Sequence, residues 1–211
     1  NLAAAFGSLV GVGAATLVSM RLGQRDYETA QRILGNVVVL NLIIGISFGL
    51  LTLVFLDPIL YFFGASDATI GYAREYMSVI LWGNVVTHMY LGLNAVLRAA
   101  GHPRKAMYAT ILTVTINAIL DPLFIFVLGL GVRGAALATV ISQAVSAVWV
   151  MTFLTGKKTR WYLKRENLHV DAKIVLPCIA LGLSPFVMQS TESLIAICFN
   201  SSLLRCGGDM A

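Results

Sequence analysis

The sequence of 211 residues is 58% hydrophobic and only 12% charged, whereas typical soluble domains are roughly 25% charged. With a mean hydropathy of +0.82, this composition predicts an integral membrane protein and excludes an ordinary soluble domain. The net charge of +5 does not indicate nucleic-acid binding, because the basic residues lie in short loops between apolar runs, where they orient helices in a membrane.

Apolar runs separated by short polar segments follow one another along the whole chain. A membrane-spanning helix needs about 20 apolar residues, and six runs approach or reach that length. Gly7 and Gly11, like Gly45 and Gly49, have the GxxxG spacing that allows helices to approach closely. Because the sequence begins without Met and stops inside a pattern, we expect both ends to continue. We predict an all-α membrane protein with six transmembrane helices, at about residues 1–20, 34–56, 76–97, 107–128, 134–154 and 174–194 or beyond.

The longest basic segment between these runs covers residues 157–172. Its Trp161 and Tyr162 are of the residue types that favour the membrane interface. The three cysteines follow no CxxC or Cys/His pattern, so we expect packed thiols and no metal cluster at Cys178, Cys198 and Cys206.

The basic residues divide unequally between the two sides of the predicted membrane. If the first loop is cytoplasmic, that side carries twelve of the 15 Lys and Arg residues, and the other side carries only Arg74, Arg133 and Arg205. Positively charged loops stay in the cytoplasm. We therefore predict a multi-pass protein of the plasma membrane, the inner membrane of a bacterium, with Asn1 and Ala211 on the outer side.

The run from residue 107 to residue 134 contains a carboxylate, Asp121, among apolar neighbours. Thr113, Asn117 and Asp121 are four residues apart, so on a helix they form one polar stripe that must face protein or water. Pro122 has no N–H, which leaves the carbonyl of Ala118 without its helical donor. These oxygens can hold a cation or a proton, and carboxylates inside membranes are functional by default. The alternative is a structural Asp121 bonded to a neighbouring helix.

Other polar side chains gather on the neighbouring predicted helices. Thr139, Ser142, Gln143 and Ser146 share one face, which either supplies neutral oxygens to a cation or holds helices together. A second polar set lies roughly along one face of the third span and consists of Asn84, Thr87, His88 and Asn94. Within this set, His88 is either a proton relay or a packing residue. Glu192 is a further carboxylate among apolar residues, with Gln189 and Ser193 on its face.

Three stretches resemble the multidrug and toxic compound extrusion (MATE) transporters. The run INAILDPLFIFVLGLGVRGAALATVISQ, residues 116–143, resembles their fifth and sixth helices. A second stretch, residues 17–36, resembles the loop between their second and third helices and reads LVSMRLGQRDYETAQRILGN. The third stretch, residues 97–111, resembles the loop between their fourth and fifth helices and reads LRAAGHPRKAMYATI. The resemblance covers essentially the whole chain, as helices two to seven of a twelve-helix, two-lobe protein.

The resemblance implies a division of the chain. Residues 1–156 would form most of the amino-terminal lobe, residues 157–172 a cytoplasmic linker between the lobes, and residues 173–211 the first helix of the carboxy-terminal lobe. Asn117, Asp121 and Thr139 match the family's amino-lobe cation site, whose remaining first-helix Asp would precede Asn1. Glu192 falls where some members have a coupling carboxylate in the other lobe.

The residues and the resemblance together predict a secondary transporter that exports small hydrophobic organic cations in exchange for sodium or protons. We expect a monomer, no cofactor and no metal other than a sodium ion at Asp121. We assign the substrate cavity to Asn84, His88, Gln143 and Gln189. The alternatives are a lipid-linked oligosaccharide flippase of the same superfamily, whose cavity would be rich in arginine, and a structural membrane protein. The spans contain no metal-ligand cluster and no paired nucleophile and base, so we expect no enzyme.

Overall fold

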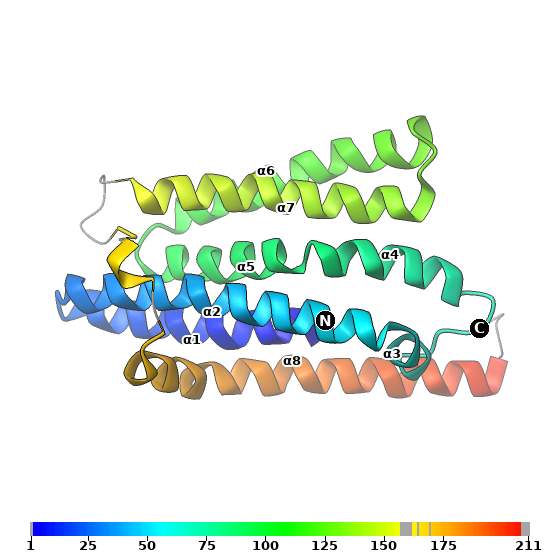
Figure 1. The fold of residues 1–211 in the computed structure, drawn as a ribbon, viewed down its shortest axis with the longest axis horizontal. Helices are drawn as coiled ribbons and strands as arrows, with labels where there is room; N and C mark the ends of the chain where they lie inside the picture. Colours follow the sequence, from blue (N-terminus) through cyan, green and yellow to red (C-terminus); the bar gives the residue numbers. More distant parts are fainter. Residues whose placement is uncertain (1, 157–161, 164, 169, 208–211) are drawn as a thin grey trace.

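The computed structural model describes residues 2–156, 162–163, 165–168 and 170–207. Within these residues the chain forms eight α-helices, one π-helical turn and one 3-10 turn, and the long helices lie side by side with their connections gathered at two ends (Figure 1). Five helices are long and apolar enough to cross a membrane, or six spans if one bent helix pair counts as one. The predicted all-α membrane architecture is confirmed.

The first two helices form an antiparallel pair. Helix α1 (Leu2–Gly23) is joined to α2 (Tyr27–Val54) by a short turn in which Arg25 adopts a positive φ of 59°. Asp26 caps α2, because its Oδ1 accepts the backbone N–H of Thr29 at 3.1 Å. The hydrogen bonds from Thr29 hold the pKa of the Asp26 carboxyl below its ordinary value.

The next span is broken. Where the sequence predicts one helix at residues 76–97, the structure has α4 (Ile70–Trp82) and α5 (Asn84–Ala99), bent by 58°. Gly83 lies at the break, and a Cβ there would overlap the side chain of Val140 from α7. Glycine thus allows α7 to pack into the bend. A short helix that the sequence analysis missed, α3 (Leu56–Phe62), precedes this pair.

The helix with the polar stripe changes its winding after the proline. Helix α6 (Pro103–Pro122) continues into the π-helical turn η1 (Leu123–Val127), where the N–H of Leu128 reaches the carbonyl of Leu123 at 3.0 Å. A tight turn then leads into α7 (Gly131–Thr155), and Gly134 of α7 packs against the backbone of Phe124.

The last helix, α8 (Ala172–Gly207), packs most extensively against α1, and its end at Gly207 lies in the range that the prediction left open beyond Leu194. Their backbones approach closely, because a Cβ on Gly13 would overlap the carbonyl of Cys178 and a Cβ on Gly182 that of Leu9. Of the cysteines, Cys178 is buried and Cys198 exposed. The side chain of Cys206 lies outside the described residues.

The bundle has one basic end, defined here as the end with the α1–α2 turn, the α5–α6 turn and the start of α8, on the left in Figure 1.

The main core lies where α1, α2 and α5 meet, and its fully buried members include Val18, Ile33, Leu34, Leu93 and Leu97.

At the basic end, the chain before α8 is fastened to α2. Asn36 is fully buried; its Oδ1 accepts the N–H of Asp171 at 2.7 Å, and its Nδ2 donates to the carbonyl of Arg32. One residue earlier, Gly35 faces the 3-10 turn η2 (Arg165–Asn167), and a Cβ there would overlap the carbonyl of Asn167. This contact places the described part of the predicted linker directly on α2.

We expect Gly35→Ala to displace η2 from α2, because the added methyl group occupies the position of the Asn167 carbonyl. Trypsin should then cleave after Arg165 faster than in the parent protein. Gly23→Ala is the matched control, since nothing lies within 4 Å of a Cβ there. Equal cleavage rates in the parent and Gly35→Ala would show that this contact does not hold the segment.

Candidate functional site

The candidate site lies at the end of α6. Asn117 donates from Nδ2 to Oδ1 of Asp121 at 3.3 Å, and both side chains are half-buried. One turn earlier, the Thr113 hydroxyl contacts Ser146 of α7 at 2.7 Å and donates to the carbonyl of Ala109. The predicted stripe therefore has two parts: Thr113 joins α6 to α7, and Asn117 with Asp121 forms an amide–carboxylate pair.

Thr139 lies on the helix that packs against this pair. Ser146 donates to Ala109, and Gly134 meets Phe124, so the antiparallel register of α6 and α7 places residues 117–121 roughly opposite residues 135–139. Among the described residues, the Thr139 hydroxyl donates to the carbonyl of Ala135 at 3.0 Å rather than to Asp121. Its lone pairs remain able to accept a proton or face a cation.

The oxygens around Asp121 suit a small monovalent cation or a proton. A carboxylate has about four lone-pair directions, and Asn117 uses one of them. Pro122 leaves the carbonyl of Ala118 without its helical N–H donor. No group of three or more His, Cys, Asp or Glu side chains that could hold a metal ion occurs in the described part of the chain. Within the described residues, the groups that could face an ion at Asp121 are therefore one carboxylate and neutral oxygens.

Polar side chains on α5 and α7 mostly join helices. Gln143 accepts the hydroxyl of Thr87 at 2.6 Å, Asn84 donates to the carbonyl of Gly45 in α2 at 2.9 Å, and Asn94 donates to the carbonyl of Ala106 in α6 at 3.2 Å.

His88 and Asn41 are buried where α1, α2 and α5 meet. His88 is 1% exposed and Asn41 fully buried, and within the described chain neither ring nitrogen and neither amide atom has a hydrogen-bond partner. The imidazole fits into the space left by Gly7, where a Cβ would lie 2.9 Å from Nδ1, and the Asn41 amide fits against Gly92. The sequence analysis did not single out Asn41, although an amide in an apolar run was a usable signal.

Glu192 and Gln189 lie on a different side of the bundle from Asp121. Both are on α8, which packs against α1 and α2, whereas α6 packs against α5 and α7 (Figure 1). Glu192 is exposed and Gln189 half-buried, and the Gln189 carbonyl accepts the hydroxyl of Ser193. The structure thus brings Asn117 and Asp121 together but keeps the two candidate acids apart.

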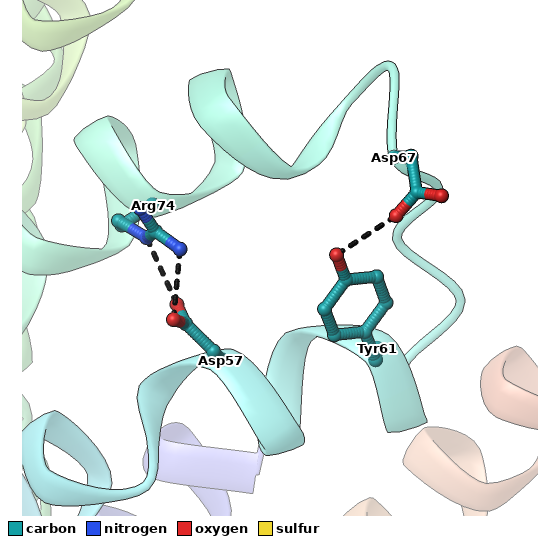
Figure 2. Close-up of polar contacts among 4 residues, drawn as sticks. All are labelled: Asp57, Tyr61, Asp67 and Arg74. Atoms are coloured by element: carbon teal, nitrogen blue, oxygen red, sulfur yellow. Dashed lines mark hydrogen bonds and ion pairs between the residues drawn. The ribbon is translucent and has the colours of Figure 1, made fainter.

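The end opposite the basic end carries ion pairs that the sequence analysis missed. Figure 2 shows Arg74 of α4 bound through two nitrogens to Asp57 of α3, at 2.9 and 2.7 Å. In the same view Tyr61 donates to Asp67, which raises the pKa of the Tyr61 phenol. Arg133 pairs with Glu75 at 3.4 Å. Arg74 and Arg133 therefore both have carboxylate partners.

Comparison with known proteins identifies the class. The long apolar helices are those of a multi-pass membrane protein, and residues 1–123 match the MatE family. The chain belongs to the MatE family of transporters, a family of carriers rather than enzymes.

The chain is 29% identical to the Multidrug export protein MepA of Staphylococcus haemolyticus (strain JCSC1435) over 203 residues, which cover 96% of this chain and 45% of that protein. An inward-facing multidrug resistance MATE family transporter of the MOP superfamily has a TM-score of 0.92 at 29% identity, covering 98% of this chain and 47% of that one. An outward-facing multidrug resistance MATE family transporter of the same superfamily has a TM-score of 0.88 at 29% identity, and the match covers 99% of this chain and 46% of that one. The chain spans about half the length of these proteins.

We expect His88→Leu to leave thermal stability unchanged or to raise it, because an apolar side chain of similar volume replaces two unpaired buried nitrogens. Asn84→Ala should lower stability by about 1 kcal/mol, since it deletes a buried donor. The folded fraction after heating, measured by size-exclusion chromatography in detergent, compares the two. A loss of stability in His88→Leu as large as that in Asn84→Ala would contradict this expectation and indicate that the imidazole is hydrogen-bonded in the folded protein.

Proposed function

We propose that this chain forms part of a secondary active efflux transporter, which exports small organic cations in exchange for sodium ions or protons by alternating access. Membership of the MatE family supports a transporter, and the printed name of the relative MepA, a multidrug export protein, supports small drug-like substrates. The coupling ion, the substrate and the residue roles below are parts of this proposal.

The observation that carries the proposal is the Asn117–Asp121 pair at the end of α6. A charged carboxylate within a bilayer costs at least roughly 2.5 kcal/mol, so its retention calls for a function. The Asn117 amide donates a hydrogen bond to the Asp121 carboxylate, and this carboxylate is the group that would take a cation or a proton. The register of α6 and α7, which sets Thr139 roughly opposite Asn117, supports Thr139 as the source of a further neutral oxygen.

The winding of α6 gives the bound ion a means of changing the protein's shape. Asp121 directly precedes Pro122 and the π-helical turn of Leu123–Val127, and such turns are frequent at functional sites. Neutralising Asp121 removes the charge that holds the Asn117 amide, so the balance between two windings of this segment shifts. Ion and substrate need only favour different states of this equilibrium.

The remaining assignments follow from position. Glu192 on α8 serves as a second coupling acid, and Asn84, His88, Gln143 and Gln189 contribute to the substrate path when helices separate. The basic end faces the cytoplasm, because the loops predicted on that side carry twelve of the 15 Lys and Arg residues of the sequence. An oligosaccharide flippase is less well supported, since the Lys and Arg residues of the described helices lie within about two turns of helix ends.

We expect Asp121→Asn to abolish ion-driven efflux while leaving membrane insertion intact, because an amide neither ionises nor binds a cation by charge. The test uses the longest open reading frame that contains this sequence, and measures efflux of a fluorescent cation from vesicles under separate sodium and pH gradients. Asp67→Asn makes the same chemical change in an exposed loop and should behave as the parent. Undiminished efflux by Asp121→Asn would refute the proposal.

Asn117→Leu should weaken ion coupling without abolishing it. The substitution removes the Asn117 carbonyl oxygen, a neutral ligand for a sodium ion beside Asp121, so the sodium concentration for half-maximal efflux should rise by roughly 10-fold, the effect of losing about 1.4 kcal/mol. Titrating efflux against the driving ion gives this value directly. An unchanged half-maximal concentration would show that Asn117 does not support the acid.

A further inference from the structure

A groove between α6 and α7 opens at the basic end of the bundle. Its volume is about 600 Å³, within the size range of small-molecule sites, and its lining includes Lys105, Leu112, Val145, Val148, Trp149 and Phe153. Val145 and Val148 are exposed on the apolar flank of the bundle. The groove therefore combines an apolar lining, which can pack against hydrocarbon, with one cationic side chain, Lys105.

The groove has a polar mouth and an apolar length. Lys105 is near the start of α6, and Leu112 lies seven residues further along, about 10 Å along the helix axis. The Lys105 ammonium lies 5.9 Å from the centre of the Phe153 ring, and the His102 ring packs against the same ring at 5.4 Å. These contacts hold the charge at the mouth.

The charge at this mouth calls for an anion. Lys105 follows Arg104 directly, and the sequence has no Asp or Glu from residue 98 to residue 120 or from residue 134 to residue 156. Neither helix can thus offer Lys105 a carboxylate within these segments, whereas the two arginines at the opposite end both have one. Basic pockets between transmembrane helices are typical binding places for anionic lipid head groups.

We propose that this groove binds one anionic glycerophospholipid, with its phosphate at Lys105 and an acyl chain along the α6–α7 groove as far as Leu112. Trp149 lines the side of the groove and suits the boundary between head group and chain. The site is separate from the Asn117–Asp121 pair, and it does not depend on which ion or drug the protein carries.

Native mass spectrometry of the purified protein, from the longest open reading frame that contains this sequence, tests the site. The protein in detergent is mixed with phosphatidylglycerol or with phosphatidylcholine of the same acyl chains, and the retained lipid is counted. We expect preferential retention of one phosphatidylglycerol. Lys105→Gln should reduce this retention about fivefold, the effect of removing one basic residue near a lipid phosphate.

A second pair of variants separates the groove from general charge attraction. Val148→Trp fills the groove without changing charge and should also lose the bound lipid, while Ile195→Trp adds the same bulk on the exposed side of α8 and should not. Lys173→Gln removes a charge from the same end but outside the groove, and should retain the lipid. Equal binding of both lipids, equal losses in Lys105→Gln and Lys173→Gln, or full retention in Val148→Trp would each overturn the proposal.

Discussion

Polar side chains inside the apolar helices of this chain depend on the protein for their hydrogen bonds, because hydrocarbon offers no partners, and among the described residues Asn41 and His88 are exceptions. Asn84 and Asn94 answer this constraint by donating to carbonyls of other helices, and Asn117 by donating to Asp121. The two bonds between helices also fix which helices are neighbours. The same constraint that makes polar residues costly therefore gives the bundle its arrangement and keeps an acid at the end of α6.

Small residues let these bonds form, because they bring the helix axes close together. Gly11 meets Gly92 where α1 crosses α5, and Gly45 meets Val85 where α2 crosses α5. Helix α6 differs, since its buried residues are only Ala106 and Ala109 among those described. The core is consequently tight where α1, α2 and α5 meet and looser around the Asn117–Asp121 pair, which stays half-buried and within reach of an ion.

Composition and apolar run length predicted the class and the approximate helices, since both follow from the thickness of a bilayer. The four-residue spacing also predicted that Asn117 and Asp121 would meet, because this contact lies within one helix. The break at Gly83 was not foreseen, as it depends on Val140 of a helix far along the chain. The Asn36–Asp171 bond and the Asp57–Arg74 pair likewise depend on tertiary neighbours, which spacing along one helix does not encode.

The contact between α1 and α8 restricts how this sequence can drift during evolution. At Gly13 and Gly182 the space of a side chain is already taken by the backbone of the opposite helix. A mutation to any other residue at either position forces the two helices apart, and a compensating change in a neighbouring side chain cannot restore the fit, because a main-chain carbonyl cannot be made smaller. These two glycines should therefore vary less among descendants of this gene than the apolar residues around them.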